Sequence, residues 1–280
     1  MQTPFESIKE QVEKKNILPK PLLDKLPRRW EKIGDVLILK LPRELGEYRE
    51  EIGEIYAKIL SCKTVLNDHG GIKGVYRKPM VEIIYGSSDT ETIHVENGIR
   101  FQLDPQRIMF SSGNIDERIR MSRISKPGER IVDLFAGIGY FTIPIAVYSK
   151  PEKIISCEIN PIAYNYLCRN IVLNHVTEIV EPRLGDNREV SPEDYADRVI
   201  MGYIGDTKDY LPVAFNTLRE HRGIIHYHDT FPDEEVPETP LKLIQETARK
   251  FNRKVFLVKY RKVKNYAPGI SHYVFDVRIN

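Results

Sequence analysis

Short apolar runs alternate with helical stretches in the chain from Arg130 onward. The expected strands lie at Ile131–Leu134, Ile154–Cys157, Val180–Leu184, Val199–Met201, Ile224–Tyr227, Val255–Val258 and Tyr273–Ile279. The expected helices lie near Phe141–Tyr148, Pro161–Asn174, Tyr210–Leu218 and Leu241–Phe251. This alternation predicts an α/β fold in which a mostly parallel seven-stranded sheet carries helices on both faces. No helix is expected between the last two strands, so we expect the final strand to run antiparallel.

The residues before this region show a different pattern, with one strand candidate, two helices and several runs of period two. The helices are expected at residues 5–16 and Tyr48–Leu60, and Leu18–Arg29, with three prolines among basic residues, reads as an exposed connector. The strands are expected at Val36–Leu41, Val81–Tyr85, Glu91–Val95 and Ile99–Leu103. The pattern predicts a small α+β domain at residues 1–100, followed by a Rossmann-like catalytic domain at residues 101–280.

Composition adds limits to this picture. The chain has 280 residues, 41% hydrophobic content and a formal net charge of +2, which suits a globular protein of two domains. Its cysteines, Cys62, Cys157 and Cys168, form no CxxC pair, so we expect free thiols, a cytoplasmic location and no metal site. The N-terminus lacks the apolar segment of a signal peptide, and no apolar run approaches ~20 residues, so no membrane span is expected.

A glycine-containing loop joins the first strand and helix of the second region: Asp133-Leu-Phe-Ala-Gly-Ile-Gly-Tyr-Phe141. Gly137 and Gly139 allow a tight turn and leave space for a ligand at the helix N-terminus. The pattern is GxG, without the third glycine that dinucleotide binders use beside a pyrophosphate. An NAD-dependent oxidoreductase is therefore disfavoured.

Acidic residues follow the first three expected strands. Glu158 ends the second strand, where a carboxylate can accept both ribose hydroxyls of an adenosine, and Asp186 follows the third, within reach of an adenine amino group. Asp133 suits a cationic amino acid group. Ligands of open α/β sheets bind at this edge. The three together favour a site for S-adenosyl-L-methionine, although Asp133 alone could be a helix cap and Glu158 alone a solvated strand end. Asn160-Pro161 is read as a helix N-terminus.

The second half of the chain, from about residue 107, resembles class I adenosylmethionine-dependent transferases. With DLFAGIGYFTIPIA and EINPIAYNYLCRNIVLN, the segments Asp104–Gly113, Glu117-Arg118 and Val263–Gly269 extend the resemblance from about Pro27 to the end. The family that they resemble joins the tRNA guanine-37 N1-methyltransferases and the tRNA wybutosine-synthesizing protein 2 enzymes, here of the archaeal type. The resemblance implies a cofactor site formed by Ser112, Arg118, Asp133, Phe135, Gly137, Glu158, Ile159, Asp186 and Asn187.

One departure bears on the reaction. The methyltransferase branch of the family carries Asn-Leu-Pro after the fourth strand, where this chain reads Met201-Gly-Tyr-Ile-Gly205. That favours the wybutosine branch, which implies transfer of the 3-amino-3-carboxypropyl group to C7 of 4-demethylwyosine at position 37 of tRNA(Phe), with release of 5′-methylthioadenosine. Gly202 should open room for a different pose of the methionine arm. Gly202 and Tyr203 are the catalytic candidates, and no general base is assigned among Tyr203, Asp206 and His228.

Basic residues are clustered despite the small net charge. Arg249–Lys264 holds eight basic residues and no acidic one, interleaved with Phe256 and Tyr260. Smaller groups lie between Arg118 and Arg130 and at Arg28-Arg29, beside Trp30. Each cluster could be only a solvated face, but basic residues with aromatics also suit phosphate contacts and base stacking. The expected partner is the anticodon loop of tRNA, with no membrane and no obligate protein partner.

Two alternatives remain open from the sequence. The first is a tRNA (guanine-37-N1)-methyltransferase, which would form S-adenosylhomocysteine and a methylated guanosine. The second is a non-catalytic RNA-binding protein that retains only the remains of a pocket. The presence of Asp133, Glu158 and Asp186 together argues against the second.

Overall fold

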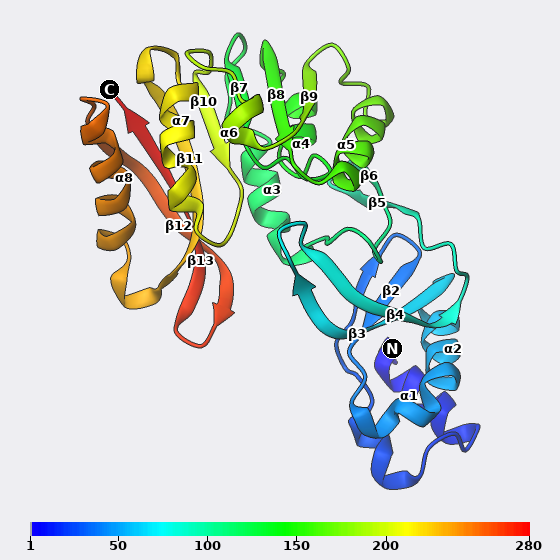
Figure 1. Cartoon of the computed structure of the whole chain (residues 1–280). Helices are drawn as coiled ribbons and strands as arrows, with labels where there is room; N and C mark the ends of the chain where they lie inside the picture. Colours follow the sequence, from blue (N-terminus) through cyan, green and yellow to red (C-terminus); the bar gives the residue numbers. More distant parts are fainter. Residues whose placement is uncertain (1) are drawn as a thin grey trace. The chain divides into compact units, whose positions relative to one another are not determined.

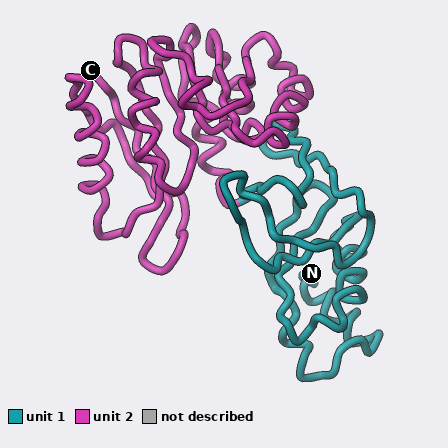
Figure 2. Tube along the Cα trace, viewed as in Figure 1, with its two compact units in different colours: residues 1–112 teal, residues 113–280 magenta. Residues whose placement is uncertain are grey.

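The computed structural model describes residues 2–280, which divide after Ser112 into two compact units, called unit 1 and unit 2 (Figure 2). The sequence pattern predicts this division near residue 100. In the structure the hairpin of β5 (Thr92–Glu96) and β6 (Ile99–Leu103), with the segment that follows it, belongs to unit 1. None of the helices within residues 2–280 is long and apolar enough to cross a membrane.

Unit 1 is built on a four-stranded sheet of order β1-β2-β3-β4. Its strands are β1 (Glu31–Ile33), β2 (Val36–Leu39), β3 (Thr64–Lys73) and β4 (Lys78–Gly86). The pair β2–β3 is parallel and is linked through α2 (Arg49–Leu60), whereas the other pairs are antiparallel. The α+β character expected for this part is present. Thr3 is the N-cap of helix α1 (Pro4–Lys14), and its side chain forms a capping box with that of Glu6.

Two features of unit 1 differ from the sequence prediction. The segment after α1 is not an exposed connector: it contains the short 3-10 helix η1 (Lys20–Lys25), and Leu18, Leu23 and Leu26 are buried in the core of the unit. Strand β3 is not expected from the sequence, because Asp68, Gly70 and Gly71 interrupt its period of two. In the structure, Asp68 Oδ1 accepts the N–H groups of both glycines at an irregular point in the β3–β4 ladder.

Unit 2 contains the expected seven-stranded sheet, in the order β12-β13-β11-β10-β7-β8-β9 (Figure 1). The strands are β7 (Arg130–Asp133), β8 (Lys153–Glu158), β9 (Val180–Leu184), β10 (Arg198–Met201), β11 (Gly223–Pro232), β12 (Val255–Ala267) and β13 (Ile270–Ile279). Five neighbouring strands, from β9 to β11, are parallel, while β13 runs antiparallel to both β11 and β12. The mostly parallel sheet with an antiparallel last strand is confirmed.

Helices pack on both faces of this sheet. They are α3 (Ile115–Met121), α4 (Thr142–Tyr148), α5 (Pro161–Leu173), α6 (Asn187–Val190), α7 (Leu211–Thr217) and α8 (Glu238–Lys250). The main core cluster joins Phe215 of α7 and Ile244 of α8 to Phe275 of β13. The adjacent residue, Asp276, is bound by Arg120 of α3 at 2.6 Å. Since successive strand residues point to opposite faces, α3 lies on the face opposite α7 and α8.

Candidate cofactor and acceptor site

The carboxyl ends of three neighbouring strands bring the predicted acidic residues to one edge of the sheet. Strand β7 pairs with β8 through Asp133 and Ser156, and β8 pairs with β9 through Glu158 and Leu184. Asp186 follows two residues after the end of β9. The register therefore places Asp133, Glu158 and Asp186 along a single edge, where open α/β sheets bind ligands.

Asp133 is completely buried, and its carboxylate oxygens accept hydrogen bonds from the glycine loop and from the first residue of α4. The Phe135 N–H donates to Oδ1 at 3.2 Å, and the Thr142 hydroxyl donates to Oδ2 at 2.9 Å. Burial raises the pKa of Asp133 to about 6, although the hydrogen bonds from Thr142 and Phe135 oppose that shift. Asp133 thus fixes the path of the chain into α4.

The glycine loop passes directly over Glu158. The Gly137 N–H donates to Glu158 Oε2 at 2.7 Å, and the Asn160 N–H donates to Oε1 at 2.7 Å. Gly137 and Gly139 have φ values of +58° and +98°, a region that favours glycine. A Cβ on Gly139 would also lie 2.5 Å from Ile143 Cγ1. Burial raises the pKa of Glu158. The loop and the end of β8 therefore form one connected structure.

The segments after β8 and β9 contribute the remaining predicted groups. Asp186 caps α6 and is paired with the guanidinium of Arg188, which lowers the pKa of the Asp186 carboxyl. Asn187 is buried and donates from Nδ2 to the Leu134 carbonyl at 2.9 Å, while its buried Oδ1 has no hydrogen-bond partner among the described residues. Ile159 is 40% exposed. The structural reading of Asn160-Pro161 is confirmed, because the Asn160 side chain accepts the Ile162 N–H at the start of α5.

Three aromatic rings gather beside these strand ends. Phe135 and Tyr203 are stacked, with centroids 5.0 Å apart and an interplanar angle of 16°. Tyr210 meets Phe135 edge to face at 5.0 Å, and the Arg188 guanidinium lies over the Tyr210 ring at 5.5 Å. Tyr210 and Arg188 are not predicted from the sequence as site residues, because neither follows an apolar strand or belongs to the glycine loop. The rings, the glycine cradle and the unpaired Asn187 oxygen suit the apolar and polar parts of an adenosine.

Gly202, immediately after β10, lies against the ring of Phe141. A Cβ on Gly202 would lie 2.6 Å from Phe141 Cε2, and the ring of Phe141 is also 5.3 Å from that of His228. The expectation that Gly202 leaves open room is therefore wrong: the space is filled by Phe141, which is only 7% exposed. The sequence does not indicate this contact, because residues 141 and 202 meet only in the folded chain.

The three candidates for a general base lie in different surroundings. His228 is buried, shares a hydrogen bond of 3.1 Å between its Nδ1 and His272 Nε2, and has a pKa well below its usual range because of burial. Asp206 is exposed and has a φ of +53°. Tyr203 belongs to the aromatic group. His228 is thus held neutral in the interior of the unit.

Ser112 and Arg118, the two cofactor residues predicted before the glycine loop, belong to different units. Ser112 is the last residue of unit 1, where its backbone N–H donates to Glu31 Oε1 at 3.0 Å. Arg118 lies on α3 in unit 2 and is 3% exposed. The neighbouring Glu117 is fully buried and receives hydrogen bonds from Arg120. Arg120 also binds Asp276 of β13, so this pair of charged residues connects α3 to the sheet.

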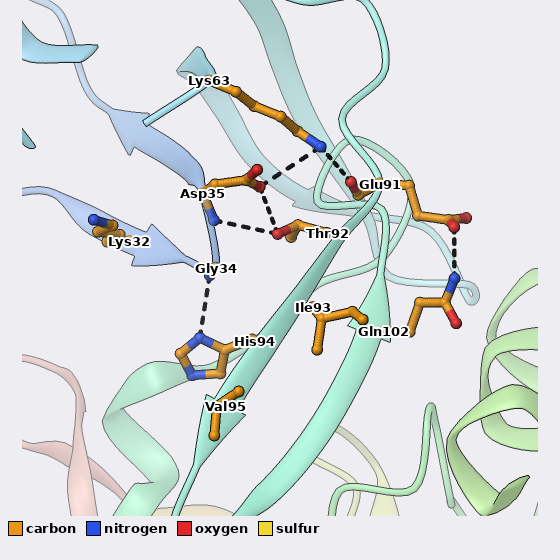
Figure 3. Close-up of a pocket in the computed structure, with 10 residues that line it drawn as sticks. All are labelled: Lys32, Gly34, Asp35, Lys63, Glu91, Thr92, Ile93, His94, Val95 and Gln102. Carbon is orange, nitrogen blue, oxygen red and sulfur yellow. Dashed lines mark hydrogen bonds and ion pairs between the residues drawn. The ribbon is translucent and has the colours of Figure 1, made fainter. Parts of the chain in front are cut away.

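A separate hollow of about 860 Å³ lies in unit 1 between the β1–β2 turn and β5 (Figure 3). Its polar groups contact one another: Thr92 Oγ1 donates to Asp35 Oδ1 at 2.6 Å, Lys63 lies 3.6 Å from the same oxygen, and the Gly34 N–H donates to His94. These contacts join the β5–β6 hairpin to the sheet. Within residues 2–280 no three His, Cys, Asp or Glu side chains are grouped to hold a metal ion, and Cys62, Cys157 and Cys168 are free.

Comparison with known proteins matches both parts of the chain. The family model of the TRM5/TYW2 methyltransferase domain matches residues 92–256, and that of the TYW2 N-terminal domain matches residues 8–90. Two archaeal relatives are named tRNA(Phe) (4-demethylwyosine(37)-C(7)) aminocarboxypropyltransferase. The protein of Pyrococcus horikoshii is 44% identical over 94% of this chain and 93% of its own length. That of Methanocaldococcus jannaschii is 48% identical over 89% of this chain and 97% of its own.

A solved structure extends the comparison to the fold. The crystal structure of P. horikoshii TYW2 in complex with MeSAdo superposes with a TM-score of 0.88, at 41% identity, and the match covers 98% of both chains. The likeness therefore includes both units of this chain.

Proposed function

The chain belongs to the TRM5/TYW2 family, and we propose that it is a tRNA-modifying transferase of its aminocarboxypropyl branch. It moves the 3-amino-3-carboxypropyl group of S-adenosyl-L-methionine to C7 of 4-demethylwyosine at position 37 of tRNA(Phe). The by-product is 5′-methylthioadenosine. The observation that carries this conclusion is the match, over nearly the whole chain, to two aminocarboxypropyltransferases at 44% and 48% identity.

The reaction is a displacement at carbon. The sulfonium of S-adenosyl-L-methionine activates the methyl carbon, the methionine γ-carbon and the ribose C5′ for attack, and the one in line with the nucleophile reacts. For this product, a bond forms between C7 of the acceptor and the γ-carbon. The bond between the γ-carbon and sulfur breaks, its electron pair goes to sulfur, and the C7 proton then leaves. The protein determines which of the three carbons reacts by orienting the two substrates.

The residues at the strand ends have a proposed division of roles. Glu158 holds the ribose edge, and its two bonds to backbone N–H groups keep the carboxylate in one orientation. Asn187 offers its unpaired Oδ1 near the adenine site, together with Asp186. Phe135 and Gly137 pack against the nucleoside, with Ile159 beside the ribose. Asp133 sets the loop and supplies negative charge for the methionine amino group.

The remaining predicted residues are proposed to contact the cofactor or the acceptor at the same site. Ser112 and Arg118 are proposed to approach the cofactor from the segment before β7. Gly202 and Tyr203 line the acceptor side, and Gly202 acts by allowing the ring of Phe141 to lie against the end of β10. Phe141 then presents a fixed apolar surface beside residue 202. In the methyltransferase branch, the asparagine that stands at the position of Gly202 would present a polar side chain there. No residue is assigned as general base.

The acceptor is tRNA, and we propose that its anticodon loop is splayed so that base 37 reaches the carboxyl edge of the sheet. Residues 1–100 are proposed to contact the tRNA. The enzyme is expected to work in the cytoplasm and without an obligate protein partner.

Mass analysis of the products tests the proposal. The protein, S-adenosyl-L-methionine and tRNA(Phe) carrying 4-demethylwyosine should give 5′-methylthioadenosine and a nucleoside heavier by the aminocarboxypropyl group. S-adenosylhomocysteine together with a methylated guanosine would instead identify the runner-up, a guanine-37 N1-methyltransferase. A failure to bind the cofactor in calorimetry would support the non-catalytic reading.

A further inference from the structure

The basic segment at the end of the chain forms the edge strand of the sheet in unit 2. Among residues 2–280, strand β12 pairs only with β13, and it is outermost in the sheet order (Figure 1). The register places Phe256 opposite Arg278, Lys259 opposite Asp276, Arg261 opposite Val274 and Lys264 opposite His272. Residues that are paired across strands share a face of the sheet. Asp276 is on the face of α3, so all of these residues point to that face.

Residues that are clustered in the sequence therefore form a row on one face of the sheet. We call this row the basic track and define it as Arg278, Phe256, Lys259, Arg261 and Lys264. Arg278 and Lys259 are exposed, and Phe256 is 48% exposed. Neighbours on one face of a strand are roughly 7 Å apart. The track therefore runs along β12 toward the hairpin end of the strand.

The hairpin end lies at the same edge of the sheet as the cofactor residues. Met201, the last residue of β10, pairs with Tyr227, and β11 continues from there to Pro232, which pairs with Ile270 at the start of β13. Lys264 is near this end, and its Nζ would lie 3.9 Å from a Cβ on Gly113. The basic track thus leads from the side of the sheet to the edge where an acceptor base must arrive.

The charges around the basic track favour a polyanion. Two acidic residues beside the track are already engaged: Asp276, which is paired with Lys259 across the strands, binds Arg120 and His226, and Glu117, which is 3.6 Å from Arg261, binds Arg120. No acidic residue lies between Arg249 and Lys264. A second copy of the chain pairing along β12 would bring two rows of like charge together, and the irregular register of β12 interrupts its edge. Phe256 gives the track a surface on which a ribose or base can pack.

We propose that the basic track binds the phosphate backbone of the tRNA substrate and leads the acceptor strand to the cofactor edge. The proposal rests on tRNA being the substrate in the proposed function. It adds a binding surface, on the opposite face from α7 and α8, to the residues that hold the cofactor. Phe256 packs against the nucleotide, and Lys259 and Arg261 contact phosphates.

Charge reversal on the two faces of the sheet tests this assignment. Lys259→Glu should raise the Kd for tRNA about tenfold and reduce the slope of log K against log salt by about one for each phosphate that the variant no longer binds. Lys242→Glu makes the same change of charge on exposed Lys242 of α8, on the other face, and should leave the Kd within about twofold. Equal effects of the two variants, or no effect of Lys259→Glu, would overturn the proposal.

The aromatic member has its own test. Phe256→Ala should raise the Kd and KM for tRNA several-fold, whereas Phe256→Tyr should restore both. Affinity for S-adenosyl-L-methionine and the unfolding temperature should remain those of the unchanged protein. A simultaneous decrease in tRNA affinity, cofactor affinity and unfolding temperature would contradict a role in RNA binding. The product decides the proposed function separately: a methylated guanosine would refute aminocarboxypropyl transfer while a tRNA defect in Lys259→Glu would still support the track.

Discussion

A Cβ on Gly202 would lie 2.6 Å from Cε2 of Phe141, so the bare backbone at residue 202 and the ring at residue 141 depend on each other. Contacts this short force one partner to move. Residue 202 follows the fourth parallel strand, at the edge that holds the glycine loop, and residue 141 ends that loop. The pair therefore couples the motif that distinguishes the two branches of the family to the loop that holds the cofactor.

The first prediction concerns this pair. Gly202→Asn should displace Phe141, destabilise the protein by about 1–3 kcal/mol through overpacking, and slow aminocarboxypropyl transfer at least about tenfold. Adding Phe141→Ala to Gly202→Asn should cost less stability than the sum of the two single changes, because the overpacking is relieved, but it should not restore the rate, because the apolar surface is still missing. The checks are thermal unfolding and the rate of 5′-methylthioadenosine release.

A matched control exists in unit 1. A Cβ on Gly46 would meet no atom within 4 Å, so Gly46→Ala should leave stability and rate unchanged. If Gly202→Ala behaved like Gly46→Ala in both measurements, the steric coupling between residues 141 and 202 would have no role.

The second prediction separates two roles of Asp133. Asp133→Asn removes a buried charge but keeps an oxygen that can accept the Phe135 N–H, so the stability at neutral pH should be equal or higher. The affinity for S-adenosyl-L-methionine should fall about tenfold, since a charge-assisted hydrogen bond to the amino group is removed. Calorimetric titration and urea unfolding measure the two effects. A lower stability with unchanged affinity would restrict Asp133 to a structural role.

The third prediction concerns Glu158. Glu158→Ala should weaken cofactor binding by roughly 1–3 kcal/mol, because a charged hydrogen-bond partner is removed. The Gly137 N–H also loses its acceptor, so the loop should become less ordered. Glu152→Ala is the matched control, since Glu152 is exposed and pairs only with Arg130 within residues 2–280. Isothermal titration should distinguish the two variants; equal affinities would argue against the ribose assignment.

The fourth prediction concerns acid sensitivity. Burial lowers the pKa of His226, His228 and His272, to about 4 for His272. The unfolded chain binds a proton at such a group below about pH 6.5, whereas the folded chain stays neutral down to the lower value. The stability should therefore decrease as pH falls from about 6.5 to 4.

The contribution of His272 to this loss of stability can be measured by comparing the unchanged protein with His272→Gln. His272 should account for roughly 2 kcal/mol of the decrease between pH 7.5 and 5, and His272→Gln should remove that part. Asp133 acts in the opposite sense, because its raised pKa makes its burial less unfavourable as pH falls through about 6. Urea unfolding of both proteins at the two pH values gives the difference. If the free energy of unfolding decreased by the same amount in both proteins between pH 7.5 and 5, a neutral, buried His272 would be contradicted.

Much of unit 2 could be predicted from local patterns, because the central strands β7, β8 and β10 are short, apolar and mostly buried. Strand β9 occupies the expected residues Val180–Leu184, and helix α5 begins at the expected Asn160-Pro161 signal. Strand β12 is expected only as Val255–Val258, since the charged residues after Val258 do not follow a buried pattern. Because β12 is the edge strand of the sheet, its residues can be charged and exposed and still form a strand.

The chemistry of the site was less accessible from the sequence. Asp133, Glu158 and Asp186 could be recognised because each follows an apolar strand. Phe141 could not, since its contact with Gly202 joins residues about sixty positions apart and depends on how α4 is placed. The burial of Leu18 was missed because proline and basic residues dominate its neighbourhood.

The most direct test of the proposed reaction is transfer with S-adenosyl-L-methionine that carries one radioactive label in the methyl group and another in the carboxyl group. With tRNA(Phe) bearing 4-demethylwyosine, the carboxyl label should enter the tRNA and the methyl label should remain in a small molecule that comigrates with 5′-methylthioadenosine. Entry of the methyl label into the tRNA, with the carboxyl label left in S-adenosylhomocysteine, would contradict the account.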